Sequence, residues 1–462
     1  MSAIAALDKR YLWHPFTQMS EWIDSSCQPL VVVEAEGAVL RTEAGEEFLD
    51  GNASIWTNIH GHNHPALNEA LKKQIDRIAH SSFLGLTNDV APRLGQALVE
   101  LLQPGCRHRA FFSDDGSTAM EAGLKMIFQA RQQRGEVSRQ KFLSLGGAYH
   151  GDTVGAMSLG KSELFHRSYG KLLFETQEVM SPACYRCPYN QSKPEKGVEA
   201  RFSRKCRWEC LEQLEKTLKK DSEKIAAFVL EPRVQGAAGL WMHPPDYLKQ
   251  AAELCREKGV WIFLDEVLTG FGRTGEMFAC HQEKLVPDVI TLAKGLTAGY
   301  LPLAATLSSQ EIFDSFLGKY EEFKTFFHGH SYTGNALGCA VALENVAIFE
   351  REKTLQKVDF VSRKLAELTQ LFWQHPNVGE VRREGAIVAI ELVEEFDSKK
   401  TFPLEKRIGH WVCEAAKKYG LLTRPIGNVL VLMPPYCVTE KQLDQMVDAL
   451  WKALNNVLPS VE

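Results

Sequence analysis

The sequence has no apolar run approaching the roughly 20 residues that a helix needs to cross a bilayer. Residues 1–11 also lack the basic and apolar segments of a secretory signal. Neither sign of charge is in large excess, with 53 Lys and Arg against 58 Asp and Glu and a net charge of -5. This balance gives no reason to expect nucleic acid or an anionic membrane as a partner. We therefore expect a cytoplasmic protein.

Paired cysteines, repeats and low-complexity tracts are also missing. The eleven cysteines are odd in number and mostly scattered, so cytosolic thiols are a better expectation than a disulfide framework. No internal repeat indicates a solenoid. What is present is ordinary globular composition, with 45% hydrophobic and 24% charged residues. A chain of 462 residues can bury a large core and form two or more lobes.

Two predicted buried strands each lead into a residue whose side chain could take part in catalysis. Val260–Leu264 runs into Asp265, and Val289–Ala293 runs into Lys294. In parallel sheets, ligands bind at the carboxyl ends of strands. A lysine amine forms Schiff bases with aldehydes, and a carboxylate keeps a pyridine nitrogen protonated. Lys294 and Asp265 together are what pyridoxal phosphate (PLP) chemistry needs. Taken singly, Lys294 could instead be a surface lysine and Asp265 a helix-capping residue.

Between these strands lies a glycine pattern that resembles a dinucleotide-binding motif. Gly270, Gly272 and Gly275 spell G-x-G-x-x-G, but five residues separate them from the strand and Pro287 follows soon after. A dinucleotide motif opens a helix directly after a strand. We therefore expect a loop here, with Arg273 as a candidate anion contact.

Further strands end at Ser113, Leu145 and Glu231, with helices between several of them. This pattern predicts an α/β fold with a mostly parallel sheet. After Ser113 come Gly116 and Ser117 at the start of a helix expected over residues 119–133. Free N–H groups, a hydroxyl and the helix dipole make this a phosphate site, with a plain N-cap as the alternative. Tyr149 stands between glycines that allow its ring to cover a flat cofactor.

The chain divides into three parts. Residues 1–75 are expected to form an N-terminal arm and an antiparallel meander that joins a small domain. Residues 76–345 are expected to form the large domain, interrupted by a loop over residues 181–210 that contains cysteines. Residues 346–462 alternate strands and helices and predict the rest of a smaller α+β domain.

Two clusters invite a metal interpretation. His60, His62 and His64 lie on a loop without a nearby acidic or cysteine ligand set. The spacing of Cys184-x-x-Cys187 and Cys206-x-x-x-Cys210 permits a zinc knuckle, but a second C-x-x-C is missing. We expect no metal at either cluster, and metal analysis would decide the cysteines.

One ordered set of motifs spans most of the chain. It consists of Gly116-Ser117-Thr118, Tyr149-His150-Gly151, Glu231-Pro232, Asp265-Glu266-Val267, Lys294-Gly295, His328-Gly329 and Arg424. This set resembles the class III aminotransferases of fold type I, which are PLP enzymes. Two further segments, 13–19 and 432–436, resemble those of members that aminate 8-amino-7-oxononanoate in biotin biosynthesis.

The resemblance implies a role for each matching position. Lys294 would bind the cofactor and carry protons, Asp265 would pair with the pyridine nitrogen, and Tyr149 would stack on the ring and line the substrate pocket. The remaining implied contacts are Gly116, Ser117, His330 and Ser331 for the cofactor, and Phe16, Ile55, Trp56, Arg273, Gly329 and Arg424 for the substrates. Ser331 would come from the second subunit of a homodimer with shared active sites, and Arg424 would hold a substrate carboxylate.

The sequence departs from the family pattern at two places. Members that use S-adenosylmethionine carry a Trp-Trp pair and an N-terminal Tyr, where this chain has Ile55-Trp56 and Phe16. His330-Ser331 replaces Pro-Thr but keeps a hydroxyl. The amino donor is thus open between S-adenosylmethionine and lysine, with a slight preference for lysine. A class III enzyme acting on ω-amino acids or diamines is the alternative function.

Overall fold

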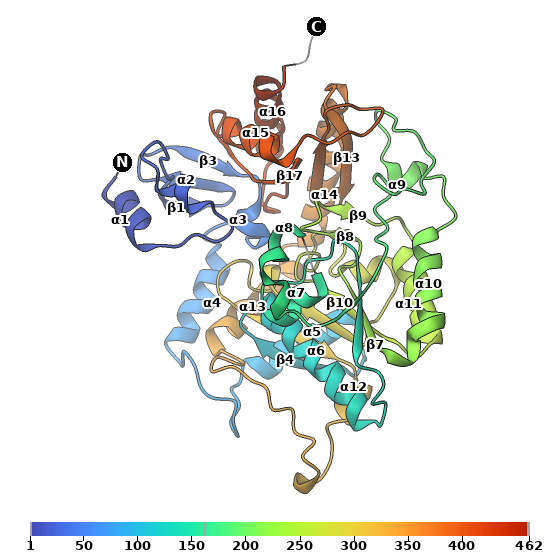
Figure 1. Ribbon diagram of the computed structural model, residues 1–462. Coiled ribbons are helices and arrows are strands. Elements are labelled where there is room, and N and C mark those ends of the chain that lie inside the picture. Colours follow the sequence, from blue (N-terminus) through green and yellow to red (C-terminus); the bar gives the residue numbers. More distant parts are fainter. Residues whose placement is uncertain (1, 161–162, 460–462) are drawn as a thin grey trace.

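The computed structural model describes residues 2–160 and 163–459, and a seven-stranded sheet lies at its centre (Figure 1). Its strands, in spatial order, are β4 (Arg109–Ser113), β12 (Ala304–Ser308), β11 (Val289–Leu292), β10 (Trp261–Asp265), β7 (Ile225–Leu230), β5 (Lys141–Leu145) and β6 (Gln177–Val179). β12 is antiparallel to both β11 and β4, and the other adjoining pairs are parallel. The predicted α/β fold with a mostly parallel sheet is confirmed.

Helices pack on the central sheet and bury its apolar strands. They include α5 (Ala91–Leu102), α6 (Gly116–Gln133), α7 (Val154–Gly160), α10 (Glu209–Asp221), α11 (Tyr247–Glu257) and α13 (Ala336–Arg351). α6 crosses the sheet closely because Gly123 has no side chain, and a Cβ there would lie 2.4 Å from the ring of Phe263. The N-terminus of α6 is thereby held at the end of the central strands.

Two four-stranded sheets lie beside the central one. The first combines β1 (Val32–Glu36), β2 (Val39–Thr42), β3 (Glu47–Asp50) and β15 (Leu421–Leu422). The second combines β13 (Val378–Glu384), β14 (Ile387–Leu392), β17 (Val429–Leu432) and β16 (Pro425–Ile426). Helices α14 (Thr354–Leu368), α15 (Ile408–Lys417) and α16 (Glu440–Val457) pack with them at the top of Figure 1. β15 joins the two ends of the chain, because it pairs in parallel with β3. The division at residues 75 and 345 stays a prediction.

The remaining elements are short. They are α3 (Ala53–Trp56), α4 (Pro65–Ile75), α8 (Glu163–His166), α9 (Ala200–Ser203), α12 (Gln310–Asp314), β8 (Val234–Gln235) and β9 (Trp241–Met242). No described helix is apolar over a length sufficient for a membrane span.

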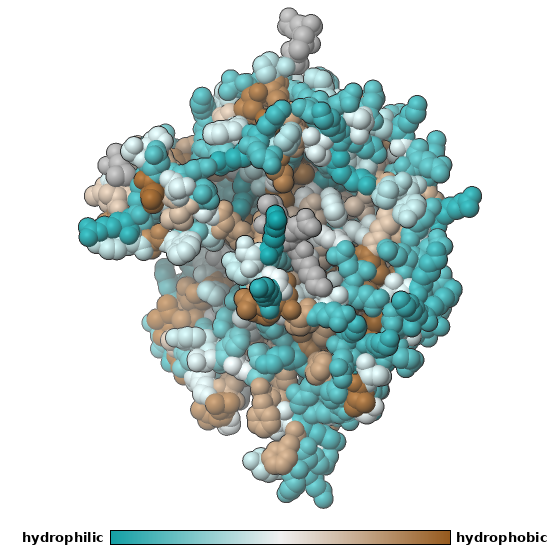
Figure 2. All heavy atoms as spheres, viewed as in Figure 1, coloured by the Kyte–Doolittle hydropathy of each residue, from teal (hydrophilic) through white to brown (hydrophobic). Residues whose placement is uncertain are grey.

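The N-terminal arm is more regular than the aromatic sequence suggests. Helix α1 (Ala3–Tyr11) precedes it and α2 (Met19–Ile23) ends it. Asp8 connects the two helices, because its carboxylate lies 3.0 Å from His14 Nε2 and accepts a hydrogen bond from Trp22 Nε1 at 2.8 Å. The arm forms the shoulder at the upper left of Figure 2, above a hollow in the surface.

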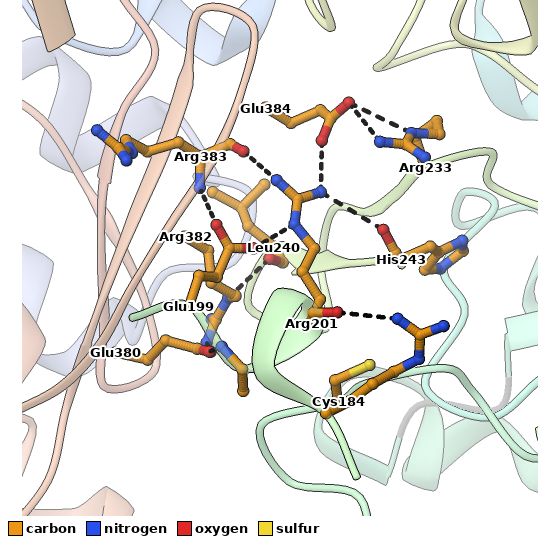
Figure 3. Close-up of polar contacts among 12 residues, drawn as sticks. Cys184, Glu199, Arg201, Arg233, Leu240, His243, Glu380, Arg382, Arg383 and Glu384 are labelled. Carbon is orange, nitrogen blue, oxygen red and sulfur yellow. Dashed lines mark hydrogen bonds and ion pairs between the residues drawn. The ribbon is translucent and has the colours of Figure 1, made fainter. Parts of the chain in front are cut away.

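The inserted segment 181–210 contacts both the central body and the smaller sheets through buried ion pairs. Figure 3 shows the Arg201 guanidinium between Glu199 and Glu384, the second of which also binds Arg233 at 2.9 Å. Arg201, Arg233 and Glu384 are buried, and the Glu199 side chain is 9% exposed. Burying charges is costly unless they are paired, so the network favours one arrangement of the insertion, β13 and the loop after β7.

Candidate active site

A cavity of about 490 Å³ opens at the carboxyl ends of the central strands. Strand β10 brings Asp265 to it, β7 brings Glu231, and the turn after β11 brings Lys294. Further lining residues come from the segments 55–57, 114–117, 149–151 and 299–303. The predicted meeting of Asp265 and Lys294 in one pocket is therefore observed, and it follows from the parallel pairing of β10 with β11.

Lys294 stands in a strained and desolvated position. Its φ angle of 42° is left-handed, which is uncommon for a residue with a side chain and typical of functional sites. Removal from water lowers the pKa of its amine, against the opposing charges of Asp265 and Glu231. The Trp56 ring lies 4.8 Å from Nζ. A lowered pKa leaves more of the amine unprotonated near neutral pH, so that it is available as a nucleophile and proton acceptor.

Asp265 is oriented by two partners. Its Oδ2 lies 2.7 Å from His150 Nδ1, and its Oδ1 accepts a hydrogen bond from the Val267 N–H at 3.0 Å. Burial lowers the pKa of His150, but the hydrogen bond and charge of Asp265 raise it above its ordinary value, aided by Glu231. The contact with His150 holds the Asp265 carboxylate in place at the end of β10, where it could pair with a pyridine nitrogen.

Glu231 is the second buried carboxylate of the pocket, beside Asp265. It accepts hydrogen bonds from the Tyr149 N–H at 3.1 Å and the Gly236 N–H at 2.7 Å. Burial raises its pKa to about 7, which His150 opposes and Asp265 supports. Its side chain thus fixes the loop that carries Tyr149.

The N-terminus of α6 fits a phosphate. Asp115 and Thr118 cap the helix through a bond of 2.9 Å from the Thr118 N–H to the Asp115 carboxylate. Gly116 and Ser117 occupy the first two helical positions, where an N–H has no intrahelical acceptor. Gly151 packs against this end, since a Cβ there would lie 2.1 Å from Ser117 Oγ. The donors, Asp265 and Lys294 line one cavity, which fits a phosphorylated pyridine aldehyde.

Tyr149, Ile55 and Trp56 line the cavity as predicted. The Tyr149 hydroxyl donates to Asp152 Oδ2 at 2.7 Å, and burial raises its pKa well above the usual value. The exposed Phe16 lies in edge contact with Phe165, which in turn contacts Tyr149, with centroid separations of 5.7 and 6.1 Å. These aromatic side chains form a continuous row from the arm to the pocket.

The two predicted arginines lie outside the cavity lining. Arg273 is buried over the Tyr436 ring and donates to the Pro434 carbonyl at 2.8 Å, while its Nε and Nη2 have no hydrogen-bond partner among the described residues. Burial lowers its pKa. Arg424 is exposed, two residues after β15. Their substrate contacts stay predictions.

Gly329, His330 and Ser331 line a different groove of about 1,280 Å³, together with Phe83, Leu84 and Phe327. His330 Nδ1 lies 2.8 Å from Asp114 Oδ2, and the Ser331 carbonyl lies 2.7 Å from His80 Nε2. None of the three lines the cavity that contains Lys294 of the same chain.

The described residues hold no group of three or more His, Cys, Asp or Glu side chains that could bind a metal. His60 instead contacts Asn345, His62 contacts Asp50 and His64 contacts Glu352. The segment around Gly270–Gly275 turns without opening a helix, as expected.

Sequence reasoning gave no site role to His150 or Glu231. Each residue had a sequence feature that could have identified it. His150 follows Tyr149 in a glycine-bounded loop, and Glu231 comes directly after a strand. Their partners are 115 and 82 residues away in sequence, so only the fold reveals the contacts.

Comparison with known proteins agrees with this geometry. The family model "Aminotransferase class-III" matches residues 23–454. The chain is 46% identical over 451 residues to adenosylmethionine-8-amino-7-oxononanoate aminotransferase of Geobacter sulfurreducens, covering 97% of each chain. The enzyme of that name from Methanocaldococcus jannaschii is 41% identical over 455 residues, which cover 97% of this chain and 96% of that one.

Solved structures show the same fold. A crystal structure of the Methanocaldococcus jannaschii enzyme superposes with a TM-score of 0.90 at 38% identity, covering 98% of each chain. The ω-transaminase of Pseudomonas jessenii in complex with PMP also gives a TM-score of 0.90, at 28% identity, with 99% of this chain and 98% of that one covered. The chain therefore belongs to the class III aminotransferases, which are PLP-dependent enzymes.

Proposed function

We propose that the protein transfers an amino group to 8-amino-7-oxononanoate, which yields 7,8-diaminononanoate in biotin biosynthesis. The observation that carries this proposal is the near full-length identity of 41–46% to enzymes with that acceptor in their name. The aromatic row from Phe16 to Tyr149 supports it, because a long acyl chain needs an apolar wall.

The residues of the pocket divide the chemistry among them. When bound, PLP supplies an electron sink for deprotonation of the substrate carbon. Lys294 takes and returns the proton at Nζ, which its lowered pKa favours. Asp265, held by His150, would pair with the ring nitrogen, and the N–H groups of Gly116 and Ser117 would bind the phosphate.

The acceptor's carboxylate requires a cation far from Lys294. Arg424 has the planar fork that suits it, and its position two residues after β15 brings it near the strand that leads to Trp56. Arg273, whose Nε and Nη2 have no hydrogen-bond partner among the described residues, is a second cation near the pocket. Its charge adds to the desolvation that lowers the pKa of Lys294. We assign the carboxylate to Arg424.

The donor is S-adenosylmethionine or lysine. Ile55 and Phe16 make the pocket wall less aromatic and remove a hydroxyl compared with the pattern for S-adenosylmethionine, which favours lysine. The alternative function, transamination of ω-amino acids or diamines, is supported by the TM-score of 0.90 to ω-transaminases.

We also propose that the protein is a homodimer whose active sites are shared between the two subunits. Large apolar side chains next to the groove are open to solvent, with Leu84 92%, Phe327 75% and Tyr332 61% exposed. In Figure 2, brown apolar atoms gather at the lower left of the molecule, below the N-terminal shoulder. Exposed apolar surface of this kind marks interaction sites. A second copy seated there would bring its Ser331 toward the phosphate end of the pocket.

A half-reaction screen tests the acceptor and the donor. The PLP form is mixed with S-adenosylmethionine or lysine, and the pyridoxamine spectrum is followed. We then add 8-amino-7-oxononanoate, which should restore the aldehyde spectrum. If simple ω-keto acids restore it and 8-amino-7-oxononanoate does not, the alternative function replaces this one.

A further inference from the structure

The wall of the pocket that carries Ile55 and Trp56 is a strained turn. Ala53, Ser54 and Trp56 have left-handed φ angles of 44°, 60° and 68°, although each has a side chain. Ser54 combines its φ with a ψ of -95°, outside the usual left-handed region. Such conformations persist only where the surrounding structure over-determines them. Something must therefore hold this turn.

The buried carboxylate of Asp50 is what holds it. Asp50 ends β3, is 2% exposed, and accepts the Ser54 N–H at 3.0 and 2.8 Å on its two oxygens. Oδ1 also accepts the Asn52 N–H at 3.2 Å, and Oδ2 lies 2.8 Å from His62 Nε2. Hydrogen bonds to an ionised acceptor are about twice as strong as neutral ones.

The turn then fixes Trp56 over the pocket. Asn52 Oδ1 accepts the indole N–H of Trp56 at 3.0 Å, and the Asn52 carbonyl accepts its backbone N–H at 3.0 Å. The ring of Trp56 lies 4.8 Å from Lys294 Nζ. A chain of contacts through Asn52 and Trp56 therefore links Asp50 to the amine of Lys294.

The same strand end connects this wall with the segment that carries Arg424. Asp50 pairs with Leu422 in the parallel β3–β15 register, two residues before Arg424. The Gly51 N–H donates to the Leu422 carbonyl, and its carbonyl accepts from the Met433 N–H, both at 2.8 Å. The charge of Asp50 also acts on Arg273 and opposes the lowering of its pKa.

We propose that Asp50, supported by His62, is a positioning residue that holds the strained turn 51–56 and so sets the place of Trp56 over Lys294. The inference rests on the aminotransferase activity and on the pocket, and it does not depend on which keto acid is the acceptor. Neutralising or removing the carboxylate releases the turn while the central sheet and the phosphate site stay intact.

The experiment compares Asp50→Ala and Asp50→Asn with wild type in the PLP-loaded enzyme. Hydrogen–deuterium exchange of peptides covering 51–57 should speed up about tenfold or more in Asp50→Ala, and less in Asp50→Asn, which keeps one acceptor oxygen. Peptides covering β10 should not change. The half-reaction rate with lysine, S-adenosylmethionine or 1-phenylethylamine, whichever donor wild type uses, should fall about tenfold.

A double-mutant cycle with Trp56→Leu separates positioning from plain stability. If Asp50 acts through Trp56, Asp50→Ala should cost little further activity in the Trp56→Leu background. Glu47→Gln is the matched control, because it converts an exposed carboxylate of the same strand to an amide and should leave exchange and activity unchanged. If Asp50→Ala does not fold, His62→Gln removes one partner of the carboxylate and takes its place.

Three outcomes would overturn the proposal. Unchanged exchange over 51–57 would show that Asp50 does not hold the turn. Additive losses in the cycle would show that it does not act through Trp56. Faster exchange over the whole protein would assign Asp50 a general structural role. If 8-amino-7-oxononanoate is not the acceptor, hydrogen–deuterium exchange over 51–57 and the donor half-reaction are unaffected. The proposed acceptor and the proposed role of Asp50 can therefore be refuted independently.

Discussion

At the scale of single residues, the pocket favours a neutral amine at Lys294, because desolvation lowers the pKa more than Asp265 and Glu231 raise it. We expect Lys294→Ala to reduce transamination by about 10²–10⁴-fold, the usual contribution of a positioned acid or base. Stopped-flow half-reactions measure this loss. Borohydride reduction should attach PLP to the Lys294 peptide in wild type and not in the variant. Lys452→Ala, an exposed lysine of α16, is the control.

Arg424 makes a second prediction at this scale. A charged hydrogen bond to a carboxylate is worth about 1.5–3 kcal/mol, or roughly ten- to hundredfold in affinity. Arg424→Ala should raise the KM for the keto acid by this factor and change the donor half-reaction much less. Arg407→Ala is the comparison variant, because Arg407 is a partly exposed arginine nearby in the chain whose partner is Glu21. Equal losses in both half-reactions would contradict the assignment.

At the scale of elements, the strands and the helix N-terminus were predictable because their signals are local. β10, β11 and α6 follow from short apolar runs and from glycine and serine after Ser113. β12 was not predicted, because Ala304–Ser308 consists mainly of small residues and lacks a run of large apolar side chains. This segment becomes a strand through its pairing with β11 and β4. The strained turn 51–56 has no sequence signature, because its residues with positive φ are not glycines.

The insertion gives a prediction about pH. Burial raises the pKa of Glu199 from 4.5 to about 7, opposed by Arg201 and Arg382 and reinforced by Glu380. The folded state then binds more protons than the unfolded state between pH 4.5 and about 7. This contribution to stability is fully present below pH 4.5 and is lost as the pH rises through about 7.

Glu199→Gln tests this sign. Its free energy of unfolding relative to wild type should increase from pH 5 to pH 8, because the amide does not lose a proton. Urea titrations at several pH values measure the difference in free energy of unfolding between the variant and wild type. Glu231, whose pKa is also raised to about 7, is present in both proteins, so its contribution cancels in this difference. Glu195→Gln, an exposed carboxylate of the same insertion, should show no such trend. A difference that does not vary with pH would contradict the prediction.

At the scale of the whole molecule, one chain contains most of a site. Lys294, Asp265 and Ser117 line one cavity, whereas Ser331 lines a separate groove of the same chain. The family resemblance already implied that Ser331 comes from a second subunit, whereas the residue pattern alone gave no geometry that separates it from Lys294, Asp265 and Ser117. If Ser331 serves a neighbouring chain, as proposed, a two-fold dimer would make two equivalent shared sites.

Complementation between two inactive variants tests this arrangement. Lys294→Ala lacks the amine, and Ser331→Asp places a negative charge next to the phosphate. If Ser331 serves the partner's pocket, each mixed dimer has one site with both residues intact. Random pairing makes half of the dimers mixed, so unfolding and refolding an equal mixture should recover about a quarter of wild-type activity. If Ser331 served the pocket of its own chain, every site would carry one defect and no activity would return. Sedimentation of the refolded mixture confirms that dimers have formed. An equal mixture of Glu47→Gln and Lys294→Ala is the control and should recover about half of wild-type activity, because Glu47→Gln homodimers have two working sites and mixed dimers have one.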